Sequence, residues 1–129
     1  MPGSRILYVD DEPDLRDIAK IALELDADFE VKTVSGGASA VALARDWRPD
    51  LFLIDVMMPG MDGPATLAAL RAIPGLGPVP AVFITARAQR YEIERLLALG
   101  AAGVIAKPFD PLALAGRVRG YLEAAQGHA

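Results

Sequence analysis

The chain has 129 residues, a length that favours one domain built around one hydrophobic core. Hydrophobic residues make up 53% of the chain. Its formal net charge is -4, whereas nonspecific nucleic-acid binding requires a basic surface, so the chain is a poor candidate for that function. Because cysteine is absent, disulfides, thiolate catalysis and cysteine-ligated metals are excluded.

The first predicted strand, residues 6–9, ends at the acidic pair Asp10-Asp11. A helix is expected to begin at Pro13, because proline suits the first helical position. Its apolar residues recur at helical spacing and are expected to face the sheet: Leu15, Ile18, Ala19, Ala22 and Leu25. Clustered carboxylates repel one another unless a cation neutralises them, so the pair is a candidate metal site. The alternative is that both carboxylates cap the helix and are solvated.

The second predicted strand, residues 29–34, alternates apolar and polar side chains, which indicates partial exposure at a sheet edge. After a helix that follows Gly36-Gly37 and runs to about Asp46, the third strand, residues 51–54, is continuously apolar and ends at Asp55. A buried strand rarely ends on a charge without a reason, and a carboxylate can attack phosphorus to form an aspartyl phosphate. The alternative is that Asp55 caps the next helix, although Asp62 fills that role more naturally.

The fourth predicted strand, residues 81–84, ends at Thr85, and a helix over residues 90–99 follows. The Thr85 hydroxyl could donate to a phosphoryl oxygen, although threonine is an ordinary strand residue. The fifth strand, residues 103–106, ends at Lys107, and the last helix begins after Asp110, a favourable N-cap. Lys107 can place a positive charge on a phosphoryl group, whereas the alternative is a surface lysine at a strand end.

Five strands that alternate with five helices predict an α/β protein with a doubly wound, three-layer α/β/α sandwich. We expect a five-stranded parallel sheet in the flavodoxin-like order 2-1-3-4-5. Since parallel strands share one carboxyl edge, the residues that follow them are expected to line one cleft: Asp10, Asp11, Asp55, Thr85 and Lys107.

The acidic residues of this cleft predict a Mg²⁺ site. Magnesium prefers hard oxygen ligands and is commonly held by one or two carboxylates together with several waters. Asp11 and Asp55 are the candidate direct ligands, and Asp10 is expected to act through water. The main-chain carbonyl of Met57 is expected to complete the protein's share of the ligands.

These residues, in this order, resemble the receiver domain of two-component response regulators, the CheY-like family. The resemblance covers nearly the whole chain. It rests on the segments Val9-Asp10-Asp11-Glu12, Asp-Val-Met-Met-Pro-Gly-Met-Asp-Gly over residues 55–63, Thr85-Ala86-Arg87 and Lys107-Pro108-Phe109.

The resemblance implies a phosphorylation-controlled switch rather than a conventional enzyme. Asp55 would be the phosphoacceptor, charged with Mg²⁺ as cofactor from a phosphohistidine on a histidine kinase or histidine phosphotransfer protein. Thr85 and Lys107 would sense the phosphoryl group, and the Lys107–Pro108 bond is expected to be cis. The chain would catalyse only its own phosphorylation and dephosphorylation, and a downstream output protein or domain would read its state. A homodimer through the fourth helix, fifth strand and fifth helix is a further possibility.

One position departs from the family pattern. Val104 lies three residues before Lys107, where the family usually carries Tyr or Phe as a switch ring. Valine has no ring to swing inward, so activation is expected to rely on the loop after Thr85 and on the fourth helix. The alternative is that Val104 is an ordinary buried strand residue and the switch works without it.

Two other functional classes remain open from the residues. A phosphate-independent binding module on the same fold has Val104 as its only support. A flavin protein or an aspartate-dependent phosphatase is disfavoured, because the acidic loop after the first strand would repel a flavin phosphate and Asp10-Asp11 lacks Asp-x-Asp spacing. We expect His128 to belong to the tail.

The expected location is the cytoplasm. The first five residues carry no apolar signal segment, and no apolar run approaches the ~18 residues of a membrane span. We therefore expect one receiver domain over residues 1–129, with neither membrane nor DNA as a direct partner. Whether it stands alone or belongs to a longer protein is left open.

Overall fold

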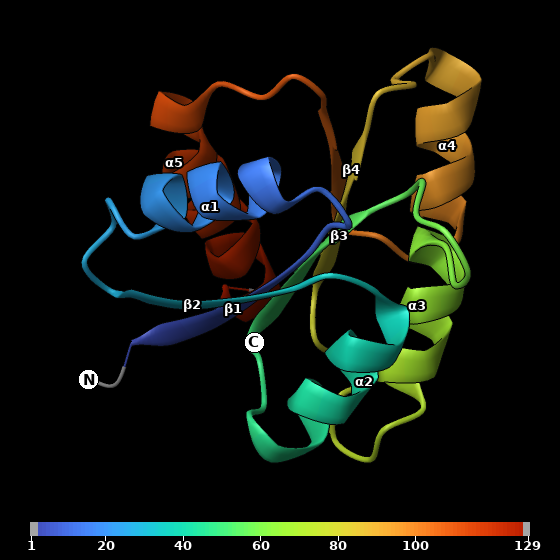
Figure 1. Ribbon diagram of the computed structural model, residues 1–129, viewed down its shortest axis with the longest axis horizontal. Coiled ribbons are helices and arrows are strands. Elements are labelled where there is room, and N and C mark those ends of the chain that lie inside the picture. The colour runs from blue at the N-terminus through green and yellow to red at the C-terminus, as the bar shows by residue number, and fades with distance from the viewer. Residues whose placement is uncertain (1–2, 128–129) are drawn as a thin grey trace.

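The computed structural model describes residues 3–127, which form one parallel sheet flanked by helices (Figure 1). The strands are β1 (Ser4–Val9), β2 (Phe29–Val34), β3 (Leu51–Asp55), β4 (Ala81–Thr85) and β5 (Gly103–Ala106). The helices are α1 (Pro13–Leu23), α2 (Gly37–Asp46), α3 (Gly63–Arg71), α4 (Arg90–Ala98) and α5 (Pro111–Gln126). The prediction for His128 lies outside the described residues.

The strand order is β2-β1-β3-β4-β5, which confirms the predicted flavodoxin-like topology. All residues of β3 and β4 are buried, whereas every second residue at the start of β2 is exposed, as expected for central and edge strands. Among the described residues, none of the helices is long and apolar enough to cross a membrane.

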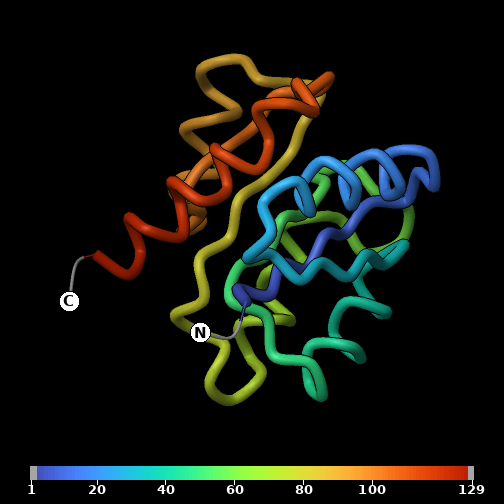
Figure 2. The backbone as a smooth tube through the Cα atoms, turned by 90° about the vertical axis from the view of Figure 1, so that its left-hand side faces the viewer, coloured from blue at the N-terminus to red at the C-terminus, as the bar shows by residue number. Residues whose placement is uncertain are grey.

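The helices cover both faces of the sheet, and each face has its own core. α1 and α5 lie side by side on one face, while α2, α3 and α4 cover the other (Figure 1; Figure 2). Tyr8 and Leu53 project into the layer under α1 and α5, and Phe52 and Phe83 project into the opposite layer. Because neighbouring strand residues point to opposite faces, two continuous apolar layers form from nearly unbroken apolar strands.

The predicted buried face of α1 is wrong in part. Ile18 is 42% exposed, and Leu25 is 64% exposed and lies beyond the helix end, whereas Ala19, Ala22 and Leu23 are buried. α1 packs against both the sheet and α5, and small alanine side chains let the helix approach both. The buried stripe is therefore rotated toward Ala19 and Leu23, and Ile18 lies at the margin.

Asp62, not Asp55, caps α3. The Asp62 side chain accepts a hydrogen bond from the Ala65 N–H at 2.9 Å, and Pro64 occupies the first turn. The same pattern begins α5, where Asp110 accepts from the Leu112 N–H at 2.9 Å. The Asp55 carboxylate is thus left available for other interactions.

Asp62→Ala is expected to lower the free energy of unfolding by about 1 kcal/mol, because one helix N–H loses its acceptor. Urea unfolding measures this loss, and Asp62→Asn serves as the matched control because asparagine is an equally good cap. Equal stability of the alanine and asparagine variants would contradict the assignment.

Candidate functional site

The carboxyl edge of the sheet gathers the polar residues predicted from the strand ends. Ile54 of β3 pairs with Val9 of β1, so Asp10 and Asp55 follow at the same level of the sheet. The Asp10 N–H continues the ladder by donating to the carbonyl of Val34 at 3.1 Å. Asp10 and Asp55 are 0% and 3% exposed, so two ionisable side chains are buried together.

Three carboxylates converge at this edge. Asp10, Asp11 and Asp55 can each offer one oxygen, and these oxygens lie within 4.8 Å of one another. Such a cluster repels itself, and a divalent cation with hard oxygen ligands would relieve the repulsion. The three residues therefore fit a metal ion such as Mg²⁺. Met57 is 62% exposed.

The environment of Asp55 disfavours its charged form. Burial, followed by repulsion from Asp10, raises the pKa of the Asp55 carboxyl to about 6, although the nearby Lys107 ammonium lowers it. The group is still mostly ionised at neutral pH. Asp55 is thus a buried carboxylate whose charged form would be stabilised by a nearby cation.

Lys107 is the cation of the site. Its Nζ lies 3.3 Å from Asp10 Oδ2, 3.3 Å from Asp55 Oδ1 and 3.6 Å from Glu12 Oε1, and its side chain is 14% exposed. Burial disfavours the ammonium, but the carboxylates outweigh it and hold the pKa of Lys107 above its ordinary value. The Lys107–Pro108 peptide bond is cis, as the resemblance implies. Sequence reasoning assigned no role to Glu12.

Asp10 is held at each of its polar atoms. Its Oδ1 accepts from the Glu12 N–H at 3.0 Å, its Oδ2 accepts from the Tyr8 hydroxyl at 2.8 Å, and its carbonyl accepts from Arg16 Nη1 at 2.8 Å. Burial, then the hydrogen bond to Asp10, raises the pKa of Tyr8 far above its ordinary value, so the hydroxyl stays a donor. Sequence reasoning missed Tyr8, although its two-residue spacing from Asp10 was the available signal.

Thr85 ends β4 with its hydroxyl engaged by the following loop. Its Oγ1 accepts from the Arg87 N–H at 2.9 Å, and the residue is 1% exposed. Val104 pairs with Phe83, two residues before Thr85, and packs half-buried against the core under α3 and α4. Val104 and Thr85 therefore share a face of the sheet, and Val104 brings no ring to that face.

A close backbone approach shapes the loop after Asp55. A Cβ on Gly63 would lie 2.7 Å from the Asp55 carbonyl oxygen, so only glycine fits there without movement. The Gly63 N–H donates to the Val56 carbonyl at 2.9 Å and closes the loop. Gly60, with φ of 77°, makes the tight turn between them. These contacts hold Asp55 at the mouth of the site.

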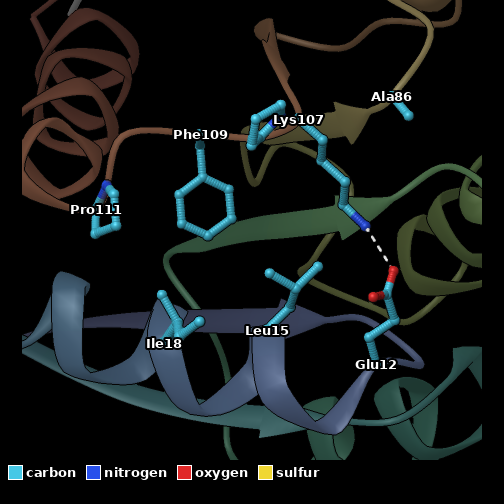
Figure 3. Close-up of a pocket in the computed structure, with 8 residues that line it drawn as sticks. Glu12, Leu15, Ile18, Ala86, Lys107, Phe109 and Pro111 are labelled. Carbon is cyan, nitrogen blue, oxygen red and sulfur yellow. Dashed lines mark ion pairs between the residues drawn. The ribbon is translucent and has the colours of Figure 1, made fainter.

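A pocket of about 420 Å³ lies beside Lys107, between α1 and the segment that joins β5 to α5 (Figure 3). Leu15 and Ile18 project from α1 toward Phe109, and Glu12 and Lys107 face each other at one end (Figure 3). Phe109 is half-buried, packs against the core under α1 and α5, and also lines this pocket. The carboxylate site thus borders an apolar hollow.

Comparison with known proteins identifies the family. The family model described as "Response regulator receiver domain" matches residues 6–119. The chain belongs to the response regulator receiver domain family. Receiver domains are the phosphorylation-controlled switches of two-component signalling, and this receiver contains the acidic cluster and lysine described above.

Relatives and solved structures agree with this assignment. DNA-binding response regulator MtrA of Mycolicibacterium smegmatis is 39% identical over 118 residues, which are 92% of this receiver and 50% of that protein. Transcriptional regulatory protein CseB of Streptomyces coelicolor is 36% identical over 119 residues, 92% of this receiver and 49% of that protein. The receiver therefore spans about half the length of these relatives.

Two solved structures show the same fold. A CheY-like receiver domain protein from Methanospirillum hungatei has a TM-score of 0.84 at 26% identity, covering 98% of this receiver and 99% of that chain. Chemotaxis protein CheY4 of Vibrio cholerae has a TM-score of 0.85 at 30% identity, covering 92% and 98%. The fold predicted from strand and helix alternation is confirmed.

Proposed function

We propose that residues 1–129 form one receiver domain in which Asp55 accepts a phosphoryl group from a phosphohistidine of a partner protein. The observation that carries this proposal is the buried Asp55 carboxylate, 3.3 Å from Lys107 and beside two further carboxylates. Asp10, Asp11, Asp55 and the carbonyl of Met57 would hold Mg²⁺ at this site. When bound, Mg²⁺ would offset negative charge on the transferred phosphoryl oxygens.

The proposed transfer uses Asp55 as the nucleophile. One carboxylate oxygen of Asp55 forms a bond to phosphorus while the bond from phosphorus to the imidazole nitrogen breaks, and that nitrogen keeps the electron pair. Because the pKa of Asp55 is about 6, most molecules carry the reactive carboxylate at neutral pH. Lys107 would move its positive charge from the carboxylates to the incoming phosphoryl oxygens. Hydrolysis of the aspartyl phosphate resets the domain.

The proposed switch involves Thr85 and its loop. The Thr85 hydroxyl donates to the Arg87 carbonyl at 3.4 Å, and it would redirect this hydrogen to a phosphoryl oxygen. Releasing the Arg87 carbonyl would loosen the loop that leads into α4 (Arg90–Ala98). With Val104 in place of a ring, we propose that this loop and α4 transmit the phosphorylated state.

We further propose the partners that this role requires. A histidine kinase or histidine phosphotransfer protein would supply the phosphoryl group in the cytoplasm, and an output protein or domain would read the result. MtrA, as its name states, binds DNA, but this receiver matches only half of the length of MtrA. We propose that the receiver itself does not bind DNA directly. A homodimer through α4, β5 and α5 is a candidate arrangement. The chain would act as a signalling switch whose only catalysis concerns its own phosphorylation and dephosphorylation.

Intact-mass spectrometry with a small-molecule phosphodonor tests the function. One added phosphoryl group is expected in the presence of Mg²⁺, and a strongly reduced amount is expected in excess EDTA. Borohydride reduction of the acyl phosphate followed by peptide mapping should place the modification at Asp55. No adduct under conditions that label a control receiver would overturn the proposal.

A further inference from the structure

Tyr8 is a buried polar residue that the proposed phosphoryl transfer does not use. It is 0% exposed in the layer between the sheet and helices α1 and α5. Tyr8 and Asp10 are two residues apart in extended backbone, so their side chains project to the same face. The Tyr8 hydroxyl accordingly reaches Asp10 Oδ2 and donates to it at 2.8 Å.

The other donors to the Asp10 carboxylate differ from Tyr8 in an informative way. The Glu12 N–H binds the opposite oxygen, Oδ1, and is fixed in the backbone. Lys107 Nζ lies 3.3 Å from Oδ2 but also lies 3.3 Å from Asp55, so its charge is divided between carboxylates. Tyr8 is therefore a neutral residue that donates a hydrogen bond to Asp10 Oδ2 from the buried core, and this bond does not depend on the position of the Lys107 ammonium.

We propose that Tyr8 is a positioning residue for the divalent-cation site, holding the Asp10 carboxylate toward Asp11 and Asp55. This inference rests on the metal site of the proposed function. Without the hydroxyl, Lys107 would be the only side chain among these contacts donating to Oδ2, and the carboxylate would turn toward it. Groups that orient metal ligands from behind commonly alter metal affinity 10- to 100-fold when removed.

Tyr8→Phe in the 129-residue chain tests the inference. Phenylalanine keeps the ring in the core and removes only the hydroxyl. Titration with MgCl₂, followed by the backbone amide resonances of Asp11 and Val56, gives the dissociation constant of the wild type and the variant. We expect the Mg²⁺ dissociation constant of the variant to rise about tenfold. A value within about twofold of the wild type would overturn the inference.

Tyr121→Phe is the matched control. Tyr121 is half-buried on α5 with its ring against Gly103, so its hydroxyl lies at a different part of the sheet. This variant is expected to leave the Mg²⁺ affinity unchanged. Urea unfolding in EDTA tests the alternative that Tyr8 has only a structural role. If the Tyr8→Phe variant loses stability but binds Mg²⁺ like the wild type, the Tyr8 hydroxyl only supplies a hydrogen bond to the buried Asp10 carboxylate, and the inference is overturned. Absence of Mg²⁺ binding by the wild type would instead overturn the metal site itself.

A second measurement uses the wild type and does not depend on the folding of the variant. Tyrosine labelled with ¹³C at Cζ gives one resonance for each of the three tyrosines, Tyr8, Tyr91 and Tyr121. Saturation with Mg²⁺ is expected to shift the Tyr8 resonance, because its acceptor changes charge environment, while the other two stay in place. An unshifted Tyr8 resonance at saturation would contradict the proposal.

Discussion

Asp55→Asn is expected to abolish phosphorylation and, in the same molecule, to stabilise the metal-free fold at neutral pH. An amide cannot form the aspartyl phosphate, so intact-mass spectrometry should find no adduct. The wild-type carboxylate is buried and repelled by Asp10, which raises its pKa from 3.8 to about 6. An uncharged amide of the same size avoids this cost, and we expect a gain of about 2 kcal/mol in the free energy of unfolding at pH 7.5.

The gain should depend on pH in a defined direction. At pH values below 3.8, Asp55 is protonated in both the folded and unfolded states, so the carboxylate has no penalty. Between pH 3.8 and about 6 the unfolded chain releases the proton more readily than the folded one, and wild-type stability falls as pH rises. The difference between variant and wild type should therefore grow across this window and level off above it. Urea unfolding in EDTA across that range measures it.

Asp17→Asn is the matched control for Asp55→Asn. Asp17 is exposed on α1 (Pro13–Leu23), so the same chemical change should alter stability by no more than about 0.5 kcal/mol. This control should acquire the phosphoryl group as the wild type does. A pH-independent difference for Asp55→Asn, or a loss of stability at pH 7.5, would show that the buried charge is not the cause.

Lys107→Met is expected to lower the free energy of unfolding of the metal-free protein by about 3 kcal/mol at neutral pH. Methionine retains most of the aliphatic stem but leaves Asp10 and Asp55 buried without their shared cation. Removing one partner of a buried ion pair is costly because the remaining charge is uncompensated. Mg²⁺ should restore part of the loss by supplying positive charge to the same carboxylates. Urea unfolding in EDTA and in MgCl₂ measures both effects.

Lys20→Met provides the comparison with an exposed ion pair. Lys20 Nζ lies 2.7 Å from Glu24 Oε2 on the surface at the C-terminal end of α1, closer than any of the three carboxylate contacts of Lys107. Exposed pairs contribute less than about 1 kcal/mol, because water already solvates both charges. If Lys107→Met and Lys20→Met lower the free energy of unfolding by the same amount, burial of the ion pair is not the cause of the large loss expected for Lys107→Met.

Much of the site could be predicted because strand ends are visible as a change from apolar to polar residues. The run Leu51–Asp55 ends on a carboxylate, Thr85 ends β4, and Lys107 follows β5. Once parallel pairing is inferred from helix–strand alternation, these ends must share an edge. The helix caps at Asp62 and Asp110 were equally visible, since capping depends on neighbouring residues alone.

The contacts of α1 show what periodicity leaves undecided. Ile18 and Ala19 both belong to an apolar stripe, yet Ile18 is 42% exposed and Ala19 is 0% exposed. The rotation of the helix depends on how closely it approaches α5, which begins about one hundred residues later in the chain. Helical spacing defines a broad apolar face, but the packing partner selects which part is buried.

The sequence by itself determined the alternation of strands and helices and the kind of side chain that ends each strand, because both follow from local patterns. Only the tertiary structure decided that the Tyr8 hydroxyl holds Asp10 and that Lys107 is shared with Asp55 and Glu12. A hydrogen bond or ion pair depends on differences of a few tenths of an ångström between side chains on separate elements. Those distances arise when the strands and helices pack together, and the periodicity of a chain does not encode them.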